Sequence, residues 1–129
     1  MSAVATLLGT PKADGILVVC DHASNAVPAG IDLGIDPALL ERHIAFDIGV
    51  AGVAGYLVQL SDCAAFLAKW SRLLVDLNRY PHDDSVIPKA SDAKVIPGNQ
   101  LNAAERDERL NHYFHPYHAE LADLVARNR

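Results

Sequence analysis

The chain has 129 residues, and half of them are hydrophobic, which suits one domain with an ordinary core. Its formal net charge of -5 comes without a basic run, so no nucleic-acid partner is expected. No apolar stretch has the length of a membrane span, and the N-terminus lacks the pattern of a signal peptide, so we expect no membrane partner and a cytoplasmic location.

The first strand is expected after a weakly patterned lead-in, residues 1–14. Ile16–Cys20 is a continuous apolar run, typical of a parallel strand that is buried on both faces. The run stops at Asp21 and His22. A carboxylate and an imidazole at a strand end can hold Zn²⁺. In the structural alternative Asp21 caps a turn and His22 bonds to the backbone, and the spacing leaves both interpretations open.

Two helices are expected next. Asp36-Pro37 is typical of a helix start, and this short helix should reach about residue 43. A second helix is predicted from residue 50 to about residue 60, with Val50, Val53, Ala54 and Leu57 forming one apolar face. Asp47 then lies near a helix N-terminus, where a cap is the usual role and metal or catalytic work is the alternative.

Residues 64–68 form the next predicted strand, so strand, helix and strand make a right-handed βαβ unit. A third buried strand is predicted at Leu73–Leu77, with Arg72 before it and Asn78-Arg79 just after it. Ligands bind at the carboxyl edge of such sheets, and two guanidinium groups suit a small anion. In the structural alternative Arg79 pairs with a helix C-terminus or with Asp76, a carboxylate within the apolar run that needs a partner if it is buried.

The rest of the chain is predicted to be a long loop, residues 81–99, and a C-terminal helix. Asn102 and Glu105 match a capping box, and Pro116 should kink the helix that follows. The side chains expected to have no catalytic role are the exposed Lys89 and Lys94, the buried and reduced Cys20 and Cys63, and the surface or hydrogen-bonding histidines His112, His115 and His118.

Five stretches together resemble the N-formylglutamate amidohydrolase family. They cover residues 15 to 120 in the family's order: Cys20-Asp-His-Ala-Ser-Asn-Ala-Val-Pro28, His43-Ile-Ala-Phe-Asp-Ile-Gly49, Ser71-Arg-Leu-Leu-Val-Asp-Leu-Asn-Arg79, Ile96-Pro-Gly-Asn99 and Pro116-Tyr-His118. The resemblance implies an α/β fold with a mostly parallel open sheet flanked by helices, zinc-peptidase-like (phosphorylase/hydrolase-like). It also implies hydrolysis of the amide bond of an N-acylated amino acid such as N-formylglutamate.

Carried over position by position, the resemblance assigns the substrate carboxylate to Asn78 and Arg79. It assigns polarisation of the scissile carbonyl to Arg72, and the first metal-binding histidine to His22, with Zn²⁺ as the expected cofactor. Distant zinc-dependent relatives have a Glu three residues after that histidine, where this chain has Asn25. The second metal ligand is therefore sought at Asp21 or Asp47; Asp21 is the candidate ligand beside His22, and Asp47 a candidate catalytic residue beside Arg72.

Members of the family run well beyond residue 129, so the chain is expected to be one partial, truncated domain, 1–129. Three functions follow as alternatives. The first is a zinc-dependent amidohydrolase acting on a small carboxylate-bearing substrate. The second is a non-catalytic module that binds such a carboxylate or anion. The third is a fragment that forms a homo-oligomer through an uncovered sheet edge.

Overall fold

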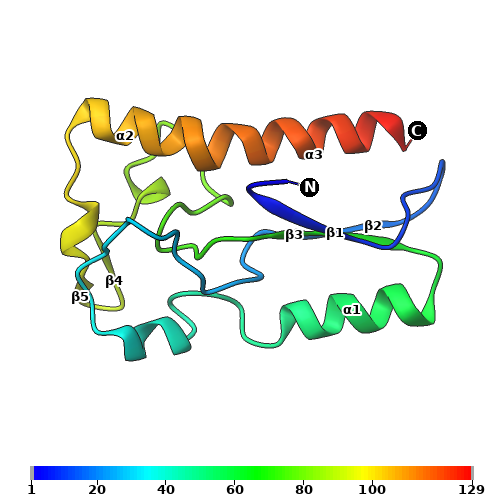
Figure 1. The fold of residues 1–129 in the computed structure, drawn as a ribbon, viewed down its shortest axis with the longest axis horizontal. Helices are drawn as coiled ribbons and strands as arrows, with labels where there is room; N and C mark the ends of the chain where they lie inside the picture. The colour runs from blue at the N-terminus through cyan, green and yellow to red at the C-terminus, as the bar shows by residue number, and fades with distance from the viewer. Residues whose placement is uncertain (1, 129) are drawn as a thin grey trace.

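The computed structural model describes residues 2–128. A central sheet separates one helix, α1, from a long helical rod that contains α2 and α3 (Figure 1). The elements, in chain order, are β1 Ala5–Leu8, β2 Leu17–Cys20, α1 Val50–Leu60, β3 Ala64–Ala68, β4 Ala90–Ser91, β5 Lys94–Val95, α2 Ala103–Arg109 and α3 His115–Arg127. No helix in this described part of the chain is both long enough and apolar enough to cross a membrane.

The main sheet has three strands in the order β1-β3-β2. The predicted βαβ unit is confirmed, because β2 and β3 pair in parallel and α1 connects them. The expected lead-in is wrong for residues 5–8, since they form β1 and pair antiparallel with β3; Met1 lies outside the described residues. The sheet is therefore mixed, where a mostly parallel one was expected.

Helix α1 has the predicted bounds but buries a different face. Its packing against the sheet uses Val50, Ala54 and Val58. Val53 and Leu57, which belong to the predicted apolar face, are 59% and 42% exposed. Every residue of this helix except Gln59 is apolar or glycine, so its apolar pattern is too broad to define one face.

The strand predicted at residues 73–77 is wrong: the segment is a buried turn. The Leu74 N–H bonds back to the Ser71 carbonyl at 3.0 Å, and the Leu73 carbonyl accepts a hydrogen bond from the Asn99 side chain at 2.7 Å. Side chains here satisfy backbone groups that a neighbouring strand would otherwise satisfy. A short apolar run has the same pattern in either environment, which is why the sequence could not distinguish them.

The two loop regions differ from expectation in detail. The helix expected from residue 36 to about residue 43 is a shorter 3-10 helix, Pro37–Glu41. The loop at 81–99 contains a small antiparallel hairpin of β4 and β5. As expected, Lys89 and Lys94 are exposed. Cys20 and Cys63 are buried and free, also as expected.

The C-terminal rod begins with the predicted capping box. The Asn102 side chain accepts from the Glu105 N–H, and the Glu105 side chain accepts from the Asn102 N–H. Between α2 and α3 lies a π-helical turn, Leu110–Phe114, and Pro116 follows it. Where a kink was expected, this wider turn accommodates the proline, and the ribbon continues as one rod (Figure 1).

Candidate functional site

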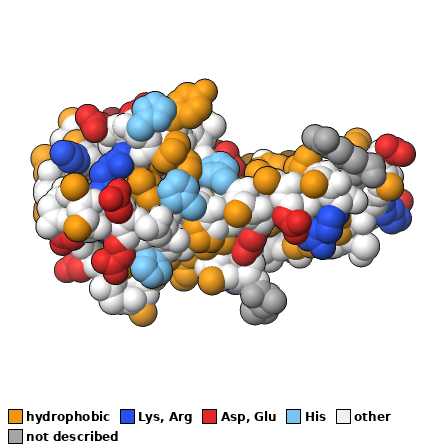
Figure 2. Space-filling model, turned by 90° about the horizontal axis from the view of Figure 1, so that it is seen from above, with side chains coloured by type: hydrophobic (Ala, Val, Ile, Leu, Met, Phe, Trp, Pro, Cys, Tyr) orange, Lys and Arg blue, Asp and Glu red, His pale blue; other side chains and the backbone are white. Residues whose placement is uncertain are grey.

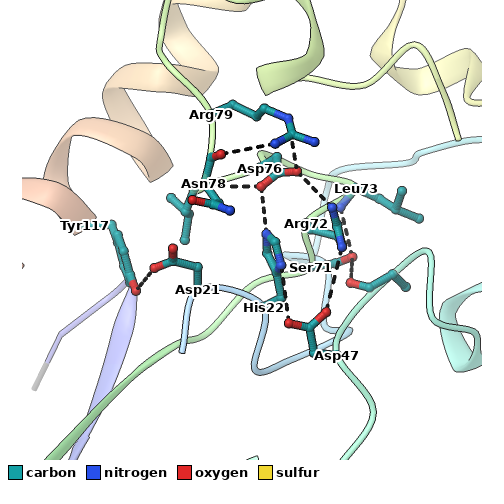
Figure 3. Close-up of polar contacts among 12 residues, drawn as sticks. Asp21, His22, Asp47, Ser71, Arg72, Leu73, Asp76, Asn78, Arg79 and Tyr117 are labelled. Carbon is teal, nitrogen blue, oxygen red and sulfur yellow. Dashed lines mark hydrogen bonds and ion pairs between the residues drawn. The ribbon is translucent and has the colours of Figure 1, made fainter. Parts of the chain in front are cut away.

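A buried carboxylate, Asp76, lies at the centre of a polar cluster in the turn after β3. Its Oδ1 is 2.7 Å from His22 Nε2 and accepts from the Asn78 N–H at 3.0 Å. Its Oδ2 accepts from Arg72 Nη2 at 3.2 Å and lies 4.0 Å from Arg79 Nε. Figure 3 shows these groups converging on one carboxylate. A buried aspartate needs partners for its charge, and four residues provide them for Asp76.

The surroundings of Asp76 keep it ionised. Burial raises its pKa, but the hydrogen bonds from His22 and the Asn78 N–H, together with the charges of His22 and Arg72, outweigh burial and hold the pKa below its ordinary value. An ionised carboxylate only accepts hydrogen bonds. His22 therefore donates through Nε2, and its Nδ1 is the nitrogen left for other chemistry.

The Nδ1 side of His22 faces Asp47. The two residues are joined through the backbone, because the Asp47 N–H donates to the His22 carbonyl at 2.9 Å. Asp47 Oδ2 lies 3.5 Å from His22 Nδ1, and Asp47 Oδ1 lies 3.8 Å from Arg72 Nη1. This contact between His22 and Asp47 is attractive when a proton or a cation lies between the two atoms. Asp47 is thus placed for proton or cation chemistry.

The capping role considered for Asp47 is wrong. The N-cap of α1 is Gly49, which has a φ of 88° and makes no side-chain capping bond. A positive φ favours glycine at this position. The Asp47 side chain is free to turn toward His22 and Arg72 instead (Figure 3).

The two arginines differ in how far the protein encloses them. Arg72 lies between the carboxylates of Asp47 and Asp76, and its side chain is 28% exposed. Among residues 2–128, Arg79 makes the long contact to Asp76 and a 3.4 Å bond to the Asn78 carbonyl, and its side chain is 44% exposed. The predicted pair of Arg79 with Asp76 is therefore present but loose. Most of the Arg79 fork stays open to a ligand.

Arg79 also lies between two hollows in the surface. A cavity of about 150 Å³ is lined by Arg72, Asp76, Arg79, Ser85 and Ser91, among others. A wider, open groove of about 590 Å³ is lined by Asn78, Arg79, Tyr80, Phe114 and His118, among others. The groove reaches the α2–α3 side of the molecule, where histidine side chains gather at the wider end (Figure 2).

The helix histidines behave largely as expected. His112 Nδ1 pairs with the Glu108 carbonyl at 2.7 Å, and His118 Nε2 pairs with the Leu77 carbonyl at 2.9 Å. The second of these bonds attaches α3 to the end of the turn that carries Asp76. It therefore positions the groove wall, although neither histidine contacts the Asp76 cluster.

Asp21 is held apart from the cluster that contains its neighbour His22. The Tyr117 hydroxyl donates to Asp21 Oδ1 at 2.7 Å, and Tyr117 is fully buried. Burial and the Asp21 contact raise the pKa of Tyr117, so the hydroxyl stays protonated as a donor. Figure 3 shows Asp21 turned to Tyr117, while His22 points to Asp76. The predicted pair of ligands, Asp21 and His22, thus face different partners.

The donor set does not fit a complete zinc site. Within residues 2–128 no group of three or more His, Cys, Asp or Glu side chains is placed to hold a metal ion. Zinc sites in proteins use at least three protein ligands. His22 Nδ1 and Asp47 Oδ2 provide two neighbouring atoms of the right chemistry, and Asp21 does not join them.

Two kinds of comparison place the chain among known proteins. A model of the N-formylglutamate amidohydrolase family matches residues 14–129. A solved structure of a gene product from Agrobacterium tumefaciens matches with a TM-score of 0.89 and 32% identity, over 98% of this chain and 51% of that one. The N-formylglutamate amidohydrolase from Ralstonia eutropha JMP134 matches with a TM-score of 0.78 and 23% identity, over 98% of this chain and 52% of that one, and shows the fold alone.

The chain therefore spans about half the length of the solved structures that it matches. No curated protein matches it.

Proposed function

The chain belongs to the N-formylglutamate amidohydrolase family, and we propose that it carries the anion-binding and proton-handling residues of a hydrolase for N-acylated amino acids. The bond cleaved is the amide C–N bond of a substrate such as N-formylglutamate. One observation carries the proposal: a single buried carboxylate, Asp76, holds His22, Arg72 and Arg79 around one point. Imidazole and guanidinium groups together suit a carboxylate-bearing amide.

Arg79 and Asn78 are the proposed carboxylate-binding residues. Both are exposed, and both line the open groove. The guanidinium fork matches a carboxylate through two parallel hydrogen bonds, and a neighbouring amide adds a neutral donor. The hollows on either side of Arg79 leave room for the acyl group and for the side chain of the bound amino acid.

Arg72 and Asp47 are the proposed catalytic residues. Arg72 is fixed by two carboxylates and retains further N–H groups, which can stabilise the oxyanion formed when water attacks the amide carbon. Asp47 and His22 Nδ1 are close enough to share the proton that water loses. Asp76 orients His22 by accepting its other N–H, as buried carboxylates do in hydrolases.

Zinc, the zinc-peptidase-like architecture and a cytoplasmic location remain parts of this proposal. The buried free cysteines support the location. The zinc proposal rests on His22 Nδ1 and Asp47, and we route no catalytic step through the metal, since the described residues lack a third ligand. Elemental analysis tests it: zinc bound near one per chain and lost in His22→Ala would support a metal site, whereas no bound zinc would contradict it.

Release of formate from N-formylglutamate, followed by NMR, tests the activity. We expect Arg72→Ala to lower kcat/KM by about 100-fold, the size seen when an oxyanion donor is removed. Arg79→Ala should mainly raise KM, because it removes a contact to the substrate carboxylate. Arg42→Ala, at an exposed position outside the cluster, is the control. Equal formate release by the parent chain and Arg72→Ala would contradict the assignment.

The second candidate is a module that binds carboxylates without cleaving them. Within residues 2–128 no third metal ligand joins His22 and Asp47, which favours this alternative. Calorimetry with N-formylglutamate distinguishes the two functions. Binding that depends on Arg79, with no formate released, would support the module and contradict the hydrolase.

A further inference from the structure

The open groove beside Arg79 is lined largely by ring and alkyl groups. These come from Leu77, Tyr80, Pro81, Phe114 and His118. Leu77 and Phe114 are each 5% exposed and belong to the core, whereas Tyr80 is 72% exposed. An exposed aromatic ring at the edge of a groove is available to a ligand. The groove therefore offers an apolar surface next to the guanidinium that is proposed to bind the substrate carboxylate.

The ring of Tyr80 has a stacking partner although it is exposed. It lies against the His82 imidazole, with the ring centroids 5.5 Å apart and the ring planes at 15°. Pro81 lies between the two residues in the sequence and restricts the backbone that carries both rings. A ring that is already held in place loses little freedom when a ligand packs on it. Tyr80 is therefore suited to contact an apolar group of a substrate.

The proposed roles of the two arginines decide which part of a substrate reaches this groove. Arg72, the proposed donor to the scissile carbonyl, lines the cavity of about 150 Å³ and is not among the described residues that line the groove. Figure 3 shows Arg72 on one side of Asp76 and Asn78, which lines the groove, on the other. With the acyl group beside Arg72 and the carboxylate on Arg79, the amino-acid side chain is left for the groove.

The charges in the groove disfavour a second carboxylate. Within residues 2–128, Arg79 is the only Lys or Arg that lines it, and Asp83 lies in its wall. Hydrogen bonds from the Ser85 N–H and hydroxyl hold the pKa of Asp83 below its ordinary value, so Asp83 is ionised at neutral pH. His118 Nε2 donates to the Leu77 carbonyl at 2.9 Å, which leaves Nδ1 of the neutral ring as an acceptor. An acidic side chain would therefore meet an anion here.

We propose that the groove selects N-acylated amino acids with an aromatic side chain, such as N-formylphenylalanine, over those with an acidic side chain. The inference rests on the proposed function, because it uses Arg79 for the carboxylate and Arg72 for the acyl group. The rings of Tyr80 and His118 pack on the ring of the substrate, and Asp83 repels an acidic side chain. Tyr80 and Asp83 are thus the specificity-determining residues.

Isothermal titration calorimetry of the parent chain with three N-formyl amino acids tests the proposal without requiring turnover. N-formylglycine, N-formylphenylalanine and N-formylglutamate share the formyl group and the main carboxylate, and differ only in the side chain. We expect N-formylphenylalanine to bind about 10-fold more tightly than N-formylglycine, because its ring packs in the groove. N-formylglutamate should bind no more tightly than N-formylglycine, because Asp83 opposes its second carboxylate.

Two substitutions identify the residues responsible. Tyr80→Ala should lower the ratio of the N-formylphenylalanine and N-formylglycine affinities by about five-fold, because the substrate ring loses its partner. Tyr56→Ala is the matched control and should leave this ratio unchanged: Tyr56 is 68% exposed and lies on α1, across the sheet from the helical rod (Figure 1). Asp83→Asn keeps a side chain that can cap the turn Asp84–Val86, and should raise the affinity for N-formylglutamate relative to N-formylphenylalanine by about three-fold.

Circular dichroism confirms the fold of each variant. N-formylglutamate that binds as tightly as N-formylphenylalanine would overturn the inference. So would a ratio that Tyr80→Ala leaves unchanged, or that Tyr56→Ala lowers equally. In each of these cases, binding of N-formylglycine that is lost in Arg79→Ala would leave the proposed function standing. If none of the three acids binds, the proposed carboxylate site fails, and this inference fails with it.

Discussion

Two polar clusters hold the same buried turn from opposite ends, and they use arginine differently. At one end the Asn99 side chain donates to the carbonyls of Leu73 and Pro88, at 2.7 and 2.8 Å, and Arg109 Nη1 donates to Asn99 Oδ1 at 2.6 Å. At the other end Asp76 holds His22, Arg72 and Arg79. The first cluster consists of a buried cation with neutral partners; the second pairs several charges.

Exposure separates the roles of the two clusters. Arg109 is 9% exposed, and burial lowers its pKa, yet its fork is filled by carbonyl groups and by Asn99. Arg79 is 44% exposed, and most of its fork faces the groove. An arginine whose donors end inside the protein serves the fold, whereas one whose donors face a hollow can bind a ligand. Substitutions in each cluster test this difference.

The largest loss of stability is expected from Asn99→Ala. The substitution removes the donor to the carbonyls of Leu73 and Pro88 and one acceptor of the Arg109 guanidinium, which should lower the free energy of unfolding by about 3 kcal/mol. Urea denaturation measures the change. Asn111→Ala, at an exposed position, should change it by less than about 0.5 kcal/mol. Equal losses for the two variants would show that the Asn99 cluster is not structural.

An intermediate loss, about 2 kcal/mol at neutral pH, is expected from Asp76→Asn. The amide keeps an acceptor for His22 but turns N–H groups toward Arg72. Because the folded-state pKa of Asp76 is lowered, its stabilising effect is present above its unfolded pKa of about 3.9 and is lost as the pH falls through the folded value. The difference from the parent chain should therefore shrink in acid.

Denaturation at a series of pH values checks this prediction. Asp84→Asn, at an exposed position, supplies the control. A difference between Asp76→Asn and the parent chain that stays constant down to pH 2, or grows in acid, would show that Asp76 is not held in its ionised form by the cluster.

Much of the fold could be predicted from local pattern. α1 has the predicted bounds, and so does the strand at residues 64–68, because a long helical repeat and a short apolar run between breakers are strong local signals. The turn at residues 73–77 could not be predicted, since the Asn99 and Arg109 side chains that bond to its carbonyl groups lie more than twenty residues away. The strand at residues 5–8 likewise depends on its pairing with β3.

The candidate site was predictable only where its features are local in the sequence. The sequence predicts that Asp76 needs a partner if it is buried, and its partners in the structure include His22, from the other predicted polar cluster. The sequence gives no sign that Asp21 would instead bond to Tyr117, which lies 96 residues away along the chain. Nor does the sequence show whether Asp47 caps α1 or lies beside His22. The answer depends on which residue occupies the N-cap position, and in the structure that residue is Gly49.

The smallest loss of stability is expected from Arg79→Ala, and it is the sharpest test of the comparison. Arg79 is largely open and makes only long contacts, so its removal should change the free energy of unfolding by less than about 0.5 kcal/mol. The same substitution should weaken binding of N-formylglutamate by about 10- to 100-fold, because a charged hydrogen-bonded pair with the ligand is lost. Arg127→Ala removes another exposed arginine, which is paired with Asp123, and should leave binding unchanged. If Arg79→Ala instead destabilised the fold as Asn99→Ala does, both ends of the turn would serve structure, and exposure would no longer distinguish a ligand-binding arginine from a structural one.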